Sequence, residues 1–157
     1  MTLRGFVEED FCNYKKPSMF LGTPSCTFKC EKECGIKCCQ NSALATAPAK
    51  YYTDESLIRR YLYNTYVHAI VIGGLEPFDS FDEIYDFIEL FREKSDDDVV
   101  IYTGYNKEEI EKYVNKLQIF PNIYIKFGRF IPNQNKRFDE VLGVTLASDN
   151  QYGERIS

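Results

Sequence analysis

The stretch Ala69-Ile-Val-Ile-Gly-Gly-Leu-Glu-Pro77 decides the fold class. Its first four residues are apolar and mostly β-branched, and two glycines follow them directly. A run that is apolar on both faces is typical of a strand buried inside a parallel sheet. The stretch therefore predicts a central parallel strand that ends in a tight, glycine-containing turn.

Alternating strands and helices are expected on both sides of this central strand. The other expected strands cover residues 18–21, 99–102, 123–127 and 141–146. The expected helices begin at a cap at Thr53 or Asp54, at Asp79 or Ser80, and at Asn106, and end near residues 64, 94 and 117. Strand–helix alternation predicts right-handed βαβ units and a mostly parallel sheet, so the expected class is α/β, with residues 1–157 as a single domain.

The ends of the expected strands carry the residues suited to a ligand site. Ligands of parallel sheets bind beyond the carboxyl ends of the strands. A cysteine-rich loop over residues 22–42, Gly73-Gly74, Thr103-Gly104 and Gly128 each follow an expected strand. We therefore expect these segments to meet at one edge of the sheet.

Composition and charge exclude several classes of function. The chain has 157 residues, 44% of them hydrophobic, and a formal net charge of −5 without a basic cluster, so no nucleic-acid partner is expected. It has no apolar run of about 18 residues, so no membrane span is expected. The first ten residues are acidic and lack the apolar segment of a signal peptide. We expect a cytoplasmic protein whose thiols stay reduced.

Five of the six cysteines lie between Cys26 and Cys39. In a reducing compartment this grouping favours metal ligation or thiol chemistry over disulfides. Thiolates close together on a loop can bind zinc or a 4Fe–4S cluster. Zinc sites usually pair their ligands as Cys-x2-Cys, a spacing that the chain lacks. Cys12 is isolated, and His68, the only histidine, is expected to be packed in an apolar stretch, so an iron–sulfur cluster is favoured over zinc.

Several short motifs, in order, resemble the radical S-adenosylmethionine superfamily. The first is Cys26-x3-Cys30 followed by Cys39-Gln-Asn41, and the second is Gly73-Gly-Leu-Glu-Pro77. Within the superfamily the chain resembles the small activating proteins of anaerobic ribonucleotide reductase. Their Thr-Gly-Tyr, Asp-Gly-Arg/Pro-Phe and Asn-Gln segments are similar to Thr103-Gly-Tyr105, Phe127-Gly-Arg-Phe130 and Asn150-Gln151, where Phe127 replaces the aspartate.

The resemblance implies a partial (β/α) barrel that uses a 4Fe–4S cluster and S-adenosylmethionine. It implies a radical enzyme that abstracts hydrogen from a glycine of a partner protein, anaerobic ribonucleotide reductase in these relatives, with flavodoxin or ferredoxin as electron donor. It implies no catalytic side chain beyond the cluster and the cofactor. The cofactor-binding residues that it implies are Gly73, Gly74, Glu76, Pro77, Thr103, Gly104, Asn150 and Gln151.

The cluster loop departs from the superfamily pattern Cys-x3-Cys-x2-Cys. The gap from Cys30 to Cys34 is one residue too long for the third ligand. If Cys39 corresponds to the third cysteine of the pattern, the loop has grown by several residues, a change that costs little free energy. The expected ligands are therefore Cys26, Cys30 and Cys39, with Cys34 as the alternative third ligand and Cys38 as a bystander.

Two other functions remain open at this point. One is a stand-alone radical enzyme that acts on a peptide or a small molecule. The other is a non-catalytic module that binds a metal or a cluster and mediates an interaction.

Overall fold

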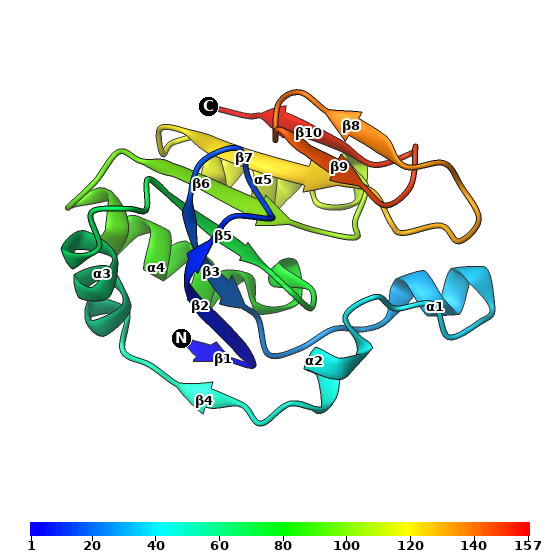
Figure 1. The fold of residues 1–157 in the computed structure, drawn as a ribbon, viewed down its shortest axis with the longest axis horizontal. Coiled ribbons are helices and arrows are strands. Elements are labelled where there is room, and N and C mark those ends of the chain that lie inside the picture. Colours follow the sequence, from blue (N-terminus) through cyan, green and yellow to red (C-terminus); the bar gives the residue numbers. More distant parts are fainter.

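One six-stranded sheet lies at the centre of the molecule in the computed structural model, which describes residues 1–157 (Figure 1). Four neighbouring strands are parallel to one another. They are, in spatial order, β3 (Ser18–Gly22), β5 (Ala69–Gly73), β6 (Asp98–Tyr102) and β7 (Ile123–Phe127). The predicted α/β class, with a mostly parallel sheet in a single domain, is confirmed, and it is consistent with a partial barrel.

Two antiparallel strands close the edges of this sheet, and the sequence patterns predicted neither. Strand β2 (Gly5–Asp10) pairs with β3, and β10 (Tyr152–Arg155) pairs with β7. A separate two-stranded pair joins β1 (Thr2–Leu3) to β4 (Lys50–Tyr51). The N-terminal segment, which the composition marks only as acidic, therefore forms one edge of the sheet.

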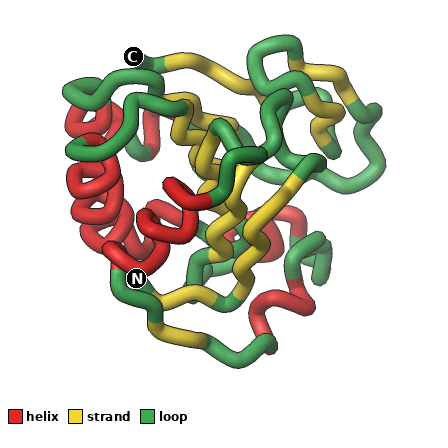
Figure 2. Tube along the Cα trace, turned by 60° about the vertical axis from the view of Figure 1, so that its left-hand side comes forward, coloured by secondary structure: helices red, strands yellow, loops and turns green.

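The central strand β5 is buried on both faces, as its sequence predicts. Ile70 and Ile72 belong to a core of 25 buried residues, whereas Ala69 and Val71 belong to a smaller cluster on the other face. This alternation follows from the two-residue period of a strand. The larger core is closed by α3 (Asp54–Tyr63), α4 (Phe81–Arg92) and α5 (Glu111–Leu117), which gather on one side of the sheet (Figure 2).

The helix boundaries agree with the expected caps in part. The Thr53 hydroxyl accepts a hydrogen bond from the Ser56 N–H and caps α3 as predicted. Helix α4 follows the 3-10 turn η1 (Pro77–Ser80) and has Ser80, one of its two expected caps, at the N-cap position, although the Ser80 side chain makes no capping hydrogen bond. Only α5 starts later than expected, because the 3-10 turn η2 (Lys107–Glu109), which Asn106 caps, precedes it. The expectation for His68 is wrong, since its side chain is exposed.

The cysteine-rich loop is more regular than a plain loop. It contains the short helix α1 (Lys29–Cys34), and a second short helix, α2 (Ser42–Thr46), begins at its last residue. Figure 1 shows both at one end of the molecule, with α3 at the opposite end. No helix of the structure is long and apolar enough to cross a membrane.

The strand expected over residues 141–146 is placed incorrectly. Only β9 (Val144–Leu146) is a strand, and it pairs with β8 (Arg137–Asp139) outside the main sheet. The Asp139 carboxylate explains this, because it accepts hydrogen bonds from the Leu142 and Gly153 N–H groups. It therefore stabilises a turn at residues 139–143 and fixes β10 in place beside it.

Candidate functional site

A cavity of about 390 Å³ lies beyond the carboxyl ends of the parallel strands. Its walls come from the cysteine loop, from the segments after β5 and β6, and from the C-terminal loop. The residues with sequence-predicted roles that line it are Cys26, Cys30, Cys39, Gly74, Glu76, Thr103, Gly104 and Gln151. Gly73, Pro77, Cys34 and Asn150 lie outside this lining.

Four cysteines line this cavity. Cys12 lies between β2 and β3 and is exposed, whereas the other three come from different parts of the cysteine-rich loop. Cys26 precedes α1, and its sulfur accepts a hydrogen bond from the Phe28 N–H at 3.2 Å. Cys30 lies in the first turn of α1, against Gly104, where an added Cβ would be 3.2 Å from its sulfur. Cys39 follows α1, and its N–H donates to the Glu31 carboxylate at 3.1 Å. A side chain at position 104 would therefore crowd the Cys30 thiol.

Cys34 does not line the main cavity. It lines a smaller hollow of about 300 Å³, which Cys30 also lines, and its sulfur lies 2.9 Å from the Cys38 sulfur. Of the two candidates for the third ligand, Cys39 is the one that shares the main cavity with Cys26 and Cys30.

A network of charged side chains attaches α1 to the rest of the site. The buried Arg129 guanidinium donates a hydrogen bond to Glu109 at 2.6 Å, and its Nε lies 3.0 Å from Glu33 as an ion pair without hydrogen-bond geometry. Lys29 donates to the same Glu109 carboxylate at 2.9 Å. Hydrogen bonding to Arg129 is the main cause that lowers the pKa of Glu109 to about 2. This network fixes α1, and with it Cys30, to the loops after β6 and β7.

Glu76 connects the ends of two neighbouring strands. Its carboxylate accepts hydrogen bonds from the Thr103 hydroxyl at 2.7 Å, the Gly104 N–H at 2.8 Å and the Phe78 N–H at 3.1 Å. Burial raises the pKa of Glu76 to about 7, although all three hydrogen bonds act in the opposite direction. The expected cofactor residues Glu76, Thr103 and Gly104 thus form one hydrogen-bonded unit.

The carbonyl groups after β5 already have partners. The Gly73 oxygen accepts from the N–H and the hydroxyl of Thr23, and the Gly74 oxygen accepts from the Asn41 side chain at 2.5 Å. Pro77 opens the η1 turn and is buried. Asn41 therefore holds the segment after Cys39 against the glycine turn.

Asn150 and Gln151 stabilise the C-terminal loop. The Gln151 carbonyl oxygen accepts from the Ala147 and Ser148 N–H groups, and its amide donates to the Gly128 oxygen. The Asn150 amide donates to the Arg129 oxygen. Both side chains therefore hold this loop against the Gly128 turn.

A model of the 4Fe-4S single cluster domain family matches residues 19–151. The chain belongs to the 4Fe-4S single cluster domain family. No curated protein and no solved structure matches the chain.

The donor set of the cavity fits the cluster after which the family is named. Cysteine thiolates are the soft ligands that an iron–sulfur cluster takes. If the thiolates of Cys26, Cys30 and Cys39 each bind one iron of a four-iron cluster, the fourth iron is left for another ligand. Burial raises the pKa of the Cys26 thiol to about 11 and raises that of Cys30, and a bound metal reverses this effect because it stabilises the thiolate. No group of three His, Cys, Asp or Glu side chains is close enough to hold a single metal ion. A four-iron cube is larger than one ion, and Cys26, Cys30 and Cys39 would hold it.

Lys126 is a residue of the site that the sequence patterns missed. It lines the cavity, is buried, and donates hydrogen bonds to the Thr103 oxygen at 3.2 Å and the Gly128 oxygen at 2.8 Å. It takes part in none of the ion pairs of the structure. Burial lowers the pKa of Lys126 to about 8. The signal for it was a lysine in a strand that is otherwise apolar on both faces.

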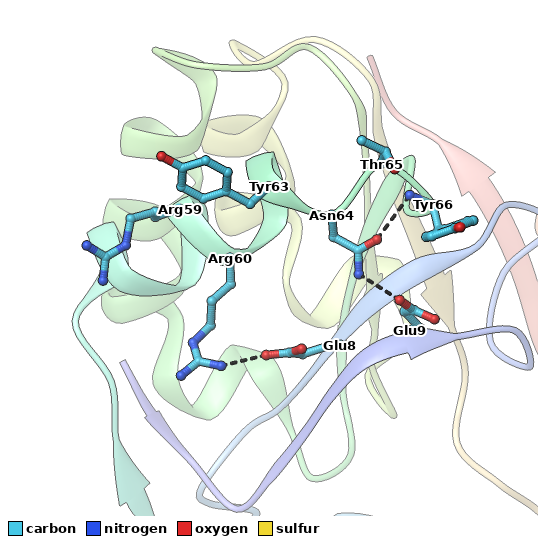
Figure 3. Close-up of a pocket in the computed structure, with 8 residues that line it drawn as sticks. All are labelled: Glu8, Glu9, Arg59, Arg60, Tyr63, Asn64, Thr65 and Tyr66. Carbon is cyan, nitrogen blue, oxygen red and sulfur yellow. Dashed lines mark hydrogen bonds and ion pairs between the residues drawn. The ribbon is translucent and has the colours of Figure 1, made fainter.

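A second hollow, of about 440 Å³, lies between β2 and the end of α3 (Figure 3). Three of its four charged groups have near partners, because Arg60 pairs with Glu8 and the Asn64 amide donates to Glu9, whereas Arg59 makes no ion pair. No cysteine lines it. We therefore assign the family's cluster to the cavity at the strand ends.

Proposed function

We propose that this chain is an activating protein that cleaves S-adenosylmethionine reductively and installs a glycyl radical on a partner protein, anaerobic ribonucleotide reductase or a close equivalent. The observation that carries the proposal is the shared cavity. Cys26, Cys30 and Cys39 line it together with Gly74 and Glu76 of the glycine-rich segment. A radical S-adenosylmethionine enzyme needs these two groups of residues next to each other, because the cofactor must bridge the cluster and the strand ends.

When bound, a reduced cluster of this type supplies one electron to the sulfonium of S-adenosylmethionine, which breaks a C–S bond and gives methionine and a 5′-deoxyadenosyl radical. The chain's share of this chemistry is to bind and orient the cofactor and to exclude water. Phe20, Tyr102 and Phe130 give the cavity apolar walls, which support the exclusion of water from the radical.

Lys126 supports an amino-acid ligand in this cavity. A buried ammonium without an anionic partner is costly, and a carboxylate placed beside it lowers that cost. Two of the three Lys126 protons are taken by carbonyl oxygens, and one remains for a ligand. The methionine end of S-adenosylmethionine carries such a carboxylate.

The partner and the electron donor follow from the resemblance to the activating proteins. We propose a glycyl-radical protein as the partner and flavodoxin or ferredoxin as the electron donor. The segments Thr103-Gly-Tyr105 and Asn150-Gln151, which the resemblance shares with these activating proteins, both lie at the cavity or against its loops.

Anaerobic reconstitution followed by reduction with S-adenosylmethionine tests the proposal. The wild-type protein should release 5′-deoxyadenosine and should produce a glycyl radical signal on a co-expressed anaerobic reductase. Cys26→Ala should abolish both products, whereas Cys38→Ala, which changes a cysteine outside the lining of the cavity, should abolish neither. Release of 5′-deoxyadenosine without a radical on the reductase would favour a stand-alone radical enzyme. Absence of both products from cluster-loaded protein would favour a non-catalytic module.

A Lys126→Met variant tests the carboxylate contact separately. It should bind S-adenosylmethionine more weakly while it retains its iron, because the hydrogen bonds of Lys126 go to carbonyl oxygens and none goes to a cysteine sulfur. Unchanged affinity for the cofactor would contradict this role of Lys126.

A further inference from the structure

Two of the five loop cysteines form a pair of their own. Cys34 is the last residue of α1, and Cys38 follows it by four positions. Their sulfur atoms lie 2.9 Å apart, so that either thiol can donate a weak hydrogen bond to the other. Neither residue lines the main cavity, where Cys26, Cys30 and Cys39 are found. The loop therefore contains a thiol pair in addition to the three cysteines assigned to the cluster.

The backbone between the two thiols is folded into a closed turn. Gly35 ends α1 with φ +69°, and its N–H donates to the Glu31 oxygen at 2.9 Å. The Cys34 thiol also contacts the Ile36 oxygen at 3.4 Å. A left-handed glycine after the last helical residue turns the chain back sharply, which brings residue 38 over the helix end. The approach of the two sulfurs is thus built into the helix cap.

The same turn determines where Cys39 lies. Glu31, on α1, accepts a hydrogen bond from the Cys39 N–H, one residue after Cys38. The segment 38–39 is therefore attached to α1 at two neighbouring points, the thiol contact and this hydrogen bond. A covalent bond at the first point would fix the second.

We propose that Cys34 and Cys38 are a redox-active dithiol that forms a disulfide by exchange with a small-molecule disulfide such as glutathione disulfide. In this exchange the two thiols lose their protons and two electrons and form one S–S bond. The S–S bond of the oxidant breaks, and the oxidant leaves as two thiols, which takes up the electrons and the protons. The disulfide closes the turn over Gly35 and holds Cys39 beside α1. The exchange itself does not depend on the proposed function; only its effect on a cluster ligand rests on it.

Both thiols are half-buried, so a small oxidant can reach them. The alternative role of Cys34 as the third cluster ligand makes the opposite prediction, because a thiolate bound to iron cannot pair with Cys38 while the iron stays in place. Disulfide mapping together with iron content therefore separates the two roles.

The experiment treats anaerobically purified, cluster-loaded protein with glutathione disulfide, alkylates the remaining thiols and maps the cysteines by mass spectrometry. Cleavage by trypsin after Lys32 and Lys37 places Cys34 on one peptide and Cys38 with Cys39 on the next, and fragmentation then identifies the partner of Cys34. The expected dominant product is the Cys34–Cys38 disulfide, with the iron content unchanged. Cys34→Ser and Cys38→Ser should each abolish this product, and Cys12→Ser should preserve it.

Three results would overturn the proposal. They are glutathione attached to Cys34 or Cys38 as the dominant product, a different internal pairing, and loss of iron in step with oxidation of Cys34. The disulfide is measured independently of cofactor cleavage. A protein that fails to cleave S-adenosylmethionine would contradict the proposed function and would leave this test intact.

Discussion

The Glu76 carboxylate accepts a hydrogen bond from the Thr103 hydroxyl at 2.7 Å and so joins the end of β5 to the end of β6. Its second oxygen accepts from the Gly104 N–H, and Gly104 leaves space for the Cys30 thiol, whose sulfur would lie 3.2 Å from a Cβ added at position 104. One buried carboxylate therefore connects the glycine-rich turn, the next strand end and the cluster loop. Removal of this carboxylate should therefore destabilise the packing of all three segments.

Glu76→Ala should destabilise the fold by about 3 kcal/mol, because it leaves buried donors at Thr103, Gly104 and Phe78 without an acceptor. Urea denaturation followed by circular dichroism measures the free energy of unfolding. Glu89→Ala, which removes an exposed carboxylate from α4, is the matched control and should change it by less than about 0.5 kcal/mol. Equal effects of the two variants would show that the Glu76 carboxylate does not hold these strand ends.

The raised pKa of Glu76 predicts how stability depends on pH. Between the ordinary value of 4.5 and about 7 the unfolded chain has lost this proton and the folded chain keeps it, so folding becomes less favourable as the pH rises through this range. The loss is on the order of 3 kcal/mol at most. Glu76→Gln cannot titrate, and the stability of the wild type should fall relative to this variant from pH 5 to pH 8. A difference that stays constant across that range would contradict the raised pKa.

Arg129→Ala should release α1 from the loops after β6 and β7. The substitution removes the cation that contacts both Glu33 and Glu109, so amide hydrogen exchange in residues 29–34 should become faster. The pKa of Glu109 should rise from about 2 towards its ordinary value, which an NMR titration of the carboxyl carbon can follow. Arg59→Ala, a change to an exposed arginine of α3, should leave both measurements unaltered. An unchanged exchange rate in α1 would rule out Arg129 as its anchor.

Gly128→Ala should destabilise the protein more than Gly35→Ala does. Both glycines have positive φ, +96° and +69°, so both substitutions carry a backbone cost of roughly 1 kcal/mol. At Gly128 the added Cβ would also lie 3.1 Å from the Asn150 oxygen, whereas nothing lies within 4 Å of it at Gly35. Thermal unfolding of the two variants measures the difference. Similar melting temperatures would show that the Asn150 oxygen can move away from the added Cβ without a loss of stability.

The parallel strands could be predicted because the sequence pattern that specifies each of them lies within the strand itself. Residues 69–73, and residues 123–127 apart from Lys126, are apolar on both faces and lead into glycine-containing turns, and the structure has both as buried strands. The edge strand β2 carries three acidic residues over Glu8–Asp10 and gives no such pattern. Its place depends on pairing with β3, which is a tertiary effect.

The sequence was sufficient to predict where the candidate site lies, but not which cysteines and which lysine line it. The strand-end rule brings the cysteine loop, Glu76 and Thr103 to one cavity. The separation of Cys34 from Cys39 depends on the Gly35 cap and on the Glu31 contact to Cys39, which are properties of the folded loop. Lys126 was missed because its importance follows from its burial without an ion-pair contact, which a sequence does not display.

The identity of the third cluster ligand tests the account most directly. Iron and sulfide are quantified, and the visible and EPR spectra recorded, on anaerobically reconstituted Cys39→Ala and Cys34→Ala proteins. The account predicts that Cys39→Ala loses the 4Fe–4S cluster and that Cys34→Ala keeps it, because Cys39 lines the main cavity together with Cys26 and Cys30 and Cys34 does not. A cluster that survives in Cys39→Ala and disappears in Cys34→Ala would contradict it.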